Sequence, residues 1–163
     1  MNWETFTGNL QATLPHITDR CFLIISTPSR ESYVQFAASS NELTAEVAGP
    51  EFATGAAAHT PDEAAMRAAG WSVPTPASPN WSRAIPLPAL SQEFAILAEQ
   101  CTTALRDTHH VENPDRLRYQ AWREPEQQPA GVTWEPERFD QLDQGENPLQ
   151  LPMLGLPQTN TPA

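Results

Sequence analysis

Residues Glu31–Val47 read ESYVQFAASSNELTAEV, and their alternation of apolar and polar side chains decides the fold. In the first half, Val34 and Phe36 alternate with Tyr33 and Gln35, so the two pairs face opposite sides of a strand. A polar turn, SSN, follows, and LTAEV then alternates again as a returning strand. The stretch therefore predicts an antiparallel β-hairpin with one buried face.

Other segments extend this hairpin into a sheet. Cys21–Ser26, CFLIIS, is apolar on both faces, which is typical of a strand that is covered on both sides or lies at the centre of a sheet. Leu117–Ala121 alternates with charged and polar residues and predicts a closing strand. Ser72–Pro88 is rich in proline, and we expect an ordered loop there, held on the core by Trp71 and Trp81.

Three helices are predicted. Residues 3–14 carry an apolar stripe at helical spacing that is stopped by Pro15. Residues 60–70 begin with a capping box and end at Gly70, a natural residue after a helix C-terminus. Residues 90–107 have the clearest amphipathic pattern in the chain.

These elements predict an α+β domain in the order α-β-β-β-α-α-β, with helices packed on one face of an antiparallel sheet. We place this domain at residues 1–123. Residues 124–163 hold seven of the 17 prolines and much charge, so we expect an extended, acidic, proline-rich tail with an apolar docking segment.

The charge of the chain limits its partners. The 163 residues carry a formal net charge of −11, which repels phosphate backbones and argues against nucleic acid. Such a surface favours a basic protein partner, or it only keeps the chain soluble. The absence of a leader or a long apolar run predicts a cytoplasmic protein without membrane contact. Cys21 and Cys101 lie in apolar patterns and are interpreted as small buried hydrophobes, with a disulfide between them left open.

No recurring catalytic motif, phosphate loop or nucleophile signature is found, so we expect no enzyme activity and no cofactor. His109 and His110 are adjacent, and neighbouring residues do not face one another on a helix or a strand. We therefore expect no metal site.

Candidate binding residues are polar and aromatic. Tyr33, Gln35, Trp71 and Trp81 have side chains that suit a partly exposed groove for a peptide, although structural packing is favoured over a groove for Tyr33 and the two indoles. We expect a sheet face or edge, together with the loop between Trp71 and Trp81, to hold an extended peptide.

The tail adds further candidates. Trp134, Phe139, Leu151 and Leu154 belong to an apolar island that is unusual for a pure linker. Such an island docks on its own domain, on a second copy or on a partner, and its prolines favour an extended form. The alternative is a disordered tail with incidental apolar residues.

A family resemblance follows from motifs in a fixed order, namely Trp3-x-x-Phe6, CFLIIS, Ser32–Ala37, Leu43–Glu46, Ala69-Gly70-Trp71 and Pro79-Asn80-Trp81. With these motifs the chain resembles the actinobacterial TY-Chap domains, which are grouped with type III secretion chaperones and the YbjN-like fold. The resemblance covers Asn2–Trp122. It implies a chaperone-like role in binding peptides or proteins, supplies no catalytic residues, and leaves a homodimer open because related secretion chaperones often pair.

Two functions remain in competition at this stage. The first is a non-catalytic chaperone or adaptor that captures a segment of a client or secreted protein. The alternative is an acidic inhibitor or immunity protein that neutralises a basic toxin or nuclease by occupying its nucleic-acid site.

Overall fold

The computed structural model describes residues 1–49 and 63–160 of the chain. They form one five-stranded sheet in the order β4-β3-β2-β1-β5, in which every neighbouring pair is antiparallel. The strands are β1 (Cys21–Ser26), β2 (Tyr33–Ala38), β3 (Glu42–Val47), β4 (Trp81–Pro86) and β5 (Arg118–Arg123). The α+β fold class predicted from the sequence is confirmed.

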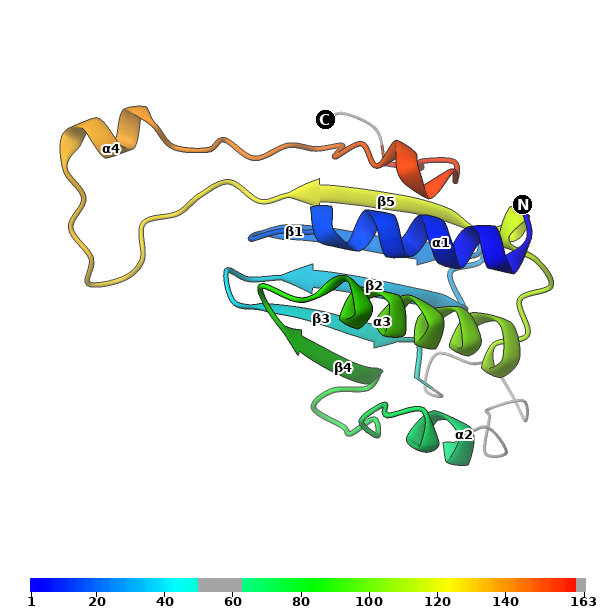
Figure 1. Ribbon diagram of the computed structural model, residues 1–163. Helices are drawn as coiled ribbons and strands as arrows, with labels where there is room; N and C mark the ends of the chain where they lie inside the picture. Colours follow the sequence, from blue (N-terminus) through cyan, green and yellow to red (C-terminus); the bar gives the residue numbers. More distant parts are fainter. Residues whose placement is uncertain (50–62, 161–163) are drawn as a thin grey trace.

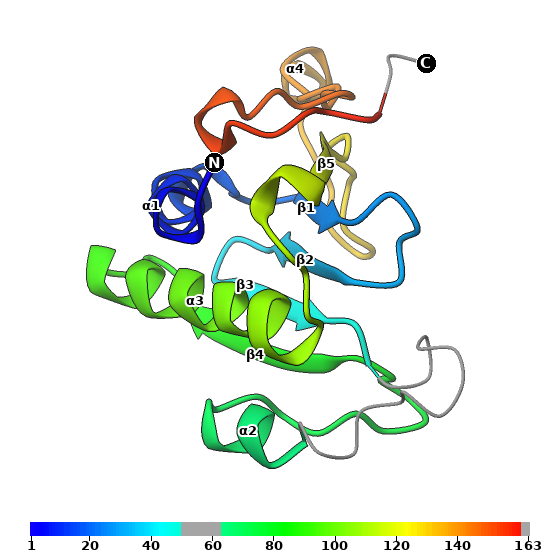
Figure 2. The same ribbon diagram turned by 90° about the vertical axis from the view of Figure 1, so that its right-hand side faces the viewer.

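Two helices cover one face of this sheet. In Figure 1, α1 (Trp3–Thr13) lies over β1 and β5, and α3 (Ser91–Thr103) lies over β2 and β3. The view in Figure 2 shows both helices on the same side. A π-helical turn, Ala104–Thr108, extends α3, and short α2 (Glu63–Ala68) lies beyond the β4 edge.

Alternation along the strands supplies the core between these layers. In β2, Val34 and Phe36 are buried under the helices, whereas Tyr33 and Gln35 are only half-buried on the opposite face. The stripe of α1 contributes Phe6 and that of α3 contributes Leu97, among others. The predicted facing of the hairpin is therefore confirmed. Cys21 and Cys101 are both free and buried, as small core side chains.

The loop expected over Ser72–Pro88 is corrected by the structure. Trp81–Pro86 is strand β4, which pairs along the whole of β3. Prolines stand before and after this short stretch, and Pro86 ends it at the sheet edge, where a missing N–H costs little. The proline-rich local sequence resembles a loop, and this stretch is a strand only because it pairs with β3.

The short helix ends as predicted. Gly70 has a φ of +99°, the left-handed backbone that glycine adopts without strain after a helix C-terminus. The predicted start of this helix, at Thr60 and Pro61, lies outside the described residues.

After β5 the chain makes a long excursion and returns. It leaves the sheet, forms α4 (Pro136–Asp140) at some distance from the other elements, and comes back beside β5 (Figure 1). A 3-10 turn, Pro152–Leu154, then packs against α1. We call residues 124–142 the arm and residues 143–160 the docked tail.

Candidate functional site

The face of the sheet opposite α1 and α3 carries no helix in the described part of the chain (Figure 2). We call this surface the open face. Strand register aligns its residues in three rows across the sheet. The rows are Trp122, Phe22, Ala37, Thr44 and Ala84; Gln120, Ile24, Gln35, Glu46 and Ser82; and Arg118, Ser26 and Tyr33. The open face is thus apolar at one end and polar at the other.

Gln35 lies in the middle row of this surface, and Tyr33 lies in the row at its polar end. The Tyr33 hydroxyl donates to Asn80 Oδ1 at 2.9 Å, and Gln35 Nε2 donates to Glu46 Oε2 at 2.9 Å. Burial raises the pKa of Tyr33 above its ordinary value, so the phenol stays protonated and donating at neutral pH. These bonds hold both side chains in fixed positions on the open face.

A hollow of about 160 Å³ opens beside these two side chains, and its walls mix apolar and polar groups. It is lined by Ile24, Ser26, Arg30, Tyr33, Gln35, Gln120 and Thr159. At the apolar end, Phe22 stacks on Trp122 with ring centroids 5.2 Å apart and an interplanar angle of 12°. Half-exposed aromatic rings with polar neighbours are a composition found in protein-binding surfaces.

Trp71 and Trp81 do not lie in an exposed groove. Both indoles belong to the core, with 4% and 6% of their surfaces exposed. Trp81 faces the helices from β4, opposite Val47 of β3. The expectation that the loop between the two residues holds a peptide is corrected. Strand β4 directs the Trp81 side chain toward the core, and the Trp71 side chain packs in the core just after the end of α2.

The docked tail closes the outer edge of β5. In an antiparallel edge strand, alternate residues direct their N–H and C=O groups outward, here those of Tyr119, Ala121 and Arg123. All six groups bond to the tail. Tyr119 bonds Pro157 and Thr159, Arg123 bonds Glu146 in both directions, and Ala121 bonds Leu149 and the Asn160 side chain.

Two leucines anchor the docked tail. Leu151 and Leu154 are 4% and 0% exposed and belong to the main core. The Leu151 N–H donates to the Tyr119 hydroxyl at 3.0 Å, and Asn9 Nδ2 on α1 donates to the Leu154 carbonyl at 3.1 Å. The last part of the apolar island predicted in the tail, which includes Leu151 and Leu154, therefore docks on the rest of its own chain.

Trp134 and Phe139 take a different position, at the far end of the arm. Their rings pack together with centroids 5.6 Å apart, and the Arg138 guanidinium lies 4.7 Å from the Trp134 ring. Arg138 also pairs with Glu126 at 2.6 Å, within the arm. Phe139 is 45% exposed, so this small cluster presents apolar surface away from the sheet.

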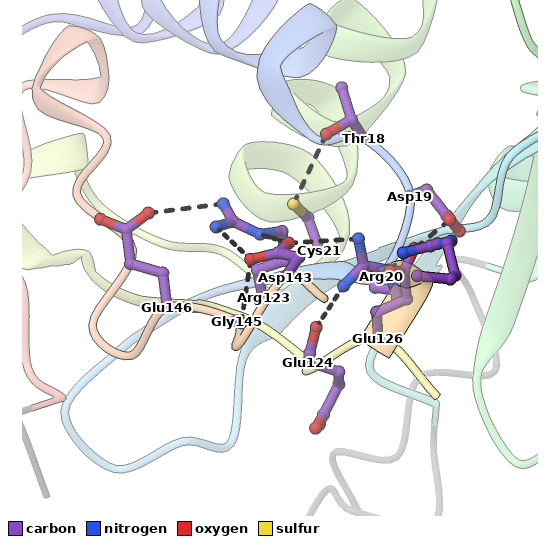
Figure 3. Close-up of polar contacts among 11 residues, drawn as sticks. Thr18, Asp19, Arg20, Cys21, Arg123, Glu124, Glu126, Asp143, Gly145 and Glu146 are labelled. Carbon is purple, nitrogen blue, oxygen red and sulfur yellow. Dashed lines mark hydrogen bonds and ion pairs between the residues drawn. The ribbon is translucent and has the colours of Figure 1, made fainter. Parts of the chain in front are cut away.

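Figure 3 shows the ion pairs that fasten the tail where it returns to the sheet. The Asp143 carboxylate accepts from Arg123 at 2.7 and 3.2 Å and pairs with Arg20 at 3.1 Å. Its hydrogen bonds from Arg123 and from the Gly145 N–H lower its pKa to about 2. Gly145 has a φ of +78°, and a Cβ there would lie 2.5 Å from the Arg123 carbonyl oxygen, so the turn requires glycine.

No metal-binding cluster of three or more His, Cys, Asp or Glu side chains occurs within residues 1–49 and 63–160. His109 Nε2 lies 3.0 Å from the Ala48 carbonyl oxygen. Among the described residues, no helix is both long and apolar enough to cross a membrane.

The sequence reasoning missed several residues that shape these surfaces. Asn9, Asn160 and the cluster of Arg20, Arg123 and Asp143 join positions far apart in the chain, and single-residue patterns carry no sign of such pairing. The alternation of Arg118–Arg123 indicates which side chains face the core, but not which segment bonds to the outer edge of the strand.

The chain matches the family model described as "T3SS (YopN, CesT) and YbjN peptide-binding chaperone 3", TY-Chap3, over residues 1–123. The protein belongs to this family, and the predicted resemblance is confirmed. The family is one of peptide-binding chaperones, which agrees with a binding module for a protein or peptide. No curated protein and no solved structure matches the chain. The match does not include the arm and the docked tail, and the actinobacterial origin stays a prediction.

Proposed function

We propose that this protein is a non-catalytic chaperone or adaptor that holds a segment of a client protein on the open face of its sheet. The single observation that carries this proposal is the open face itself, on which Tyr33 and Gln35 border a hollow beside half-exposed aromatic rings. The family supports a peptide as the ligand.

The open face suits capture by shape and apolar contact. The Phe22–Trp122 stack offers rigid apolar area, while Gln35, Glu46 and Gln120 offer hydrogen-bonding groups along the next row. The net charge of −11 speeds the approach of basic clients and repels nucleic acid. Binding therefore needs no chemical step, in agreement with the expectation of a protein that is not an enzyme.

A peptide array tests this proposal. We expect wild-type protein to bind a subset of peptides enriched in apolar and basic residues, and Ile24→Lys to lose that binding because Ile24 lines the hollow. Ile96→Lys is the matched control, since Ile96 is a 45% exposed residue of α3 on the helical side. If Ile24→Lys and Ile96→Lys bind the same peptides equally well, the open face is not the client surface.

The arm supports a second candidate, the acidic inhibitor. Residues 124–142 carry five carboxylates against one arginine, around the exposed cluster of Trp134 and Phe139. An acidic projection with an aromatic tip suits insertion into a basic cleft of a toxin or nuclease. The test is rescue of cells expressing the toxin of an adjacent gene. Trp134→Ser/Phe139→Ser is expected to abolish rescue, and unchanged rescue would contradict this candidate.

Location and oligomeric state complete the proposal. Two unpaired cysteines agree with a reducing compartment, and we place the protein in the cytoplasm. Cell fractionation checks this location. A homodimer is proposed from the pairing of related secretion chaperones, and sedimentation equilibrium decides it.

A further inference from the structure

The docked tail lies on β5 as a bound peptide would. It satisfies the outward backbone groups of Tyr119, Ala121 and Arg123 by an antiparallel approach near Glu146 and a parallel return near Gln158. Strand addition of this kind recognises the backbone of an extended segment with little regard to its sequence.

Side-chain recognition comes from the two leucine anchors. Leu151 and Leu154 enter the core between β5 and α1, while Met153 between them is 41% exposed. Tyr119 and Asn9 meet the backbone at the same two residues. A 3-10 turn, Pro152–Leu154, brings the two leucines to the same side, so the site selects leucines three residues apart across such a turn. We call it the α1–β5 groove.

The way the tail is attached lets it leave. The arm stands away from the sheet, and its Arg138–Glu126 pair joins arm residues to each other (Figure 1). The side chains of Asp143, Arg20 and Arg123 are partly exposed, so the ion pairs between them weaken as salt is added (Figure 3). Undocking of the tail gives up its hydrogen bonds to β5 and the burial of Leu151 and Leu154, but it breaks no hydrogen bond between the five strands.

We propose that the α1–β5 groove is a second peptide-binding site, that residues 143–160 are its resident occupant, and that a client segment with leucines three residues apart on a 3-10 turn displaces them. This inference rests on the proposed function and makes the protein an autoinhibited chaperone. The tail competes at the millimolar effective concentration of a tethered ligand, so it weakens the apparent affinity for any competing peptide.

The test uses the full chain and a defined probe, a fluorescent peptide with the sequence of Asp143–Asn160. Its binding to each protein is followed by fluorescence anisotropy. Leu151→Ser/Leu154→Ser releases the tail without changing the groove, and we expect it to bind the probe roughly 10- to 100-fold more tightly than wild type. Met153→Ser is the matched control and is expected to behave as wild type. The same peptide with serine at both leucine positions is the control probe.

The outcomes separate cleanly. A folded Leu151→Ser/Leu154→Ser protein that binds the probe no better than wild type, or binds the control probe equally well, overturns the inference. In case this variant does not fold, a protease site inserted between Gln128 and Val132 allows the arm to be cut in the wild-type fold. After cleavage the probe must replace the tail fragment, and failure to exchange overturns the inference too. If the probe does not bind but the protein still binds array peptides and loses them on Ile24→Lys, only this inference fails and the proposed function stands. If the probe binds as expected but Ile24→Lys leaves array binding unchanged, only the open face is contradicted as the client surface.

Discussion

Substitution of Leu154 by alanine is the sharpest test of how the tail is held. The Leu154 side chain is completely buried, in the 3-10 turn that packs on α1. Removal of a buried leucine side chain costs about 2–5 kcal/mol through lost transfer free energy and the cavity left behind. The free energy of tail docking sets an upper limit on this cost, since the variant can release the tail instead of keeping a cavity.

Because the variant can release the tail without unfolding the sheet, the assay must report docking locally, and hydrogen exchange of single amides does so. The Tyr119 N–H donates to Pro157 and the Arg123 N–H to Glu146, so both amides report tail docking directly. A loss of 2 kcal/mol in docking free energy speeds exchange of these amides about 30-fold. Amides between β1 and β2 should change far less, because the tail pairs with β5, which lies on the other side of β1 from β2.

Met153→Ala provides the matched control. Met153 is the neighbour of Leu154 and is 41% exposed, and a surface change of this kind costs within about 0.5 kcal/mol. Equal exchange rates at Tyr119 in the two variants would refute the reasoning, because the burial of Leu154 would then contribute nothing to docking.

Three further outcomes are expected. The pKa of Asp143 is lowered from 3.8 to about 2 in the folded chain, so its contribution to stability is complete above pH 4 and is lost as the pH falls toward 2. Hydrogen exchange of the Arg123 amide, measured as a function of pH, should therefore speed up in acid in the wild type, and Asp143→Asn should remove that part of the pH dependence. Gly49→Ala should destabilise the fold by several kcal/mol in urea titrations, because its Cβ would lie 1.8 Å from the Pro79 carbonyl oxygen, and a loss below about 1 kcal/mol would contradict that crowding. Burial raises the pKa of the Cys101 thiol, so Ellman's reagent should modify it only at the rate of unfolding, and rapid labelling of native protein would show an open core.

Local patterns accounted for most of the fold. Alternation in the hairpin placed Val34 and Phe36 inside and Tyr33 and Gln35 outside, because the side-chain period of a strand is two residues whatever its partner. The stripes of α1 and α3 were visible for the equivalent reason. Strand β4 was missed because prolines flank it and only pairing with β3 makes it a strand.

The candidate site divided along the same line. The facing of Tyr33 and Gln35, away from the helices, was predicted correctly because it follows from the periodicity of the strand. Trp71 and Trp81 were left between a groove and structural packing, because an indole that is buried and one that lines a groove have the same local sequence; their burial confirms packing. Leu151 and Leu154 were flagged as apolar, but their docking place on α1 and β5 was not specified.

By itself, the sequence determined the α+β class, the inward and outward faces of the central strands, the acidic surface and the family. Only the tertiary structure decided that β4 completes the sheet, that both indoles are buried, and that the tail closes the β5 edge. The physical reason is range: periodicity and charge act along neighbouring residues, whereas edge pairing and groove filling join groups such as Ala121 and Asn160 that meet only after folding.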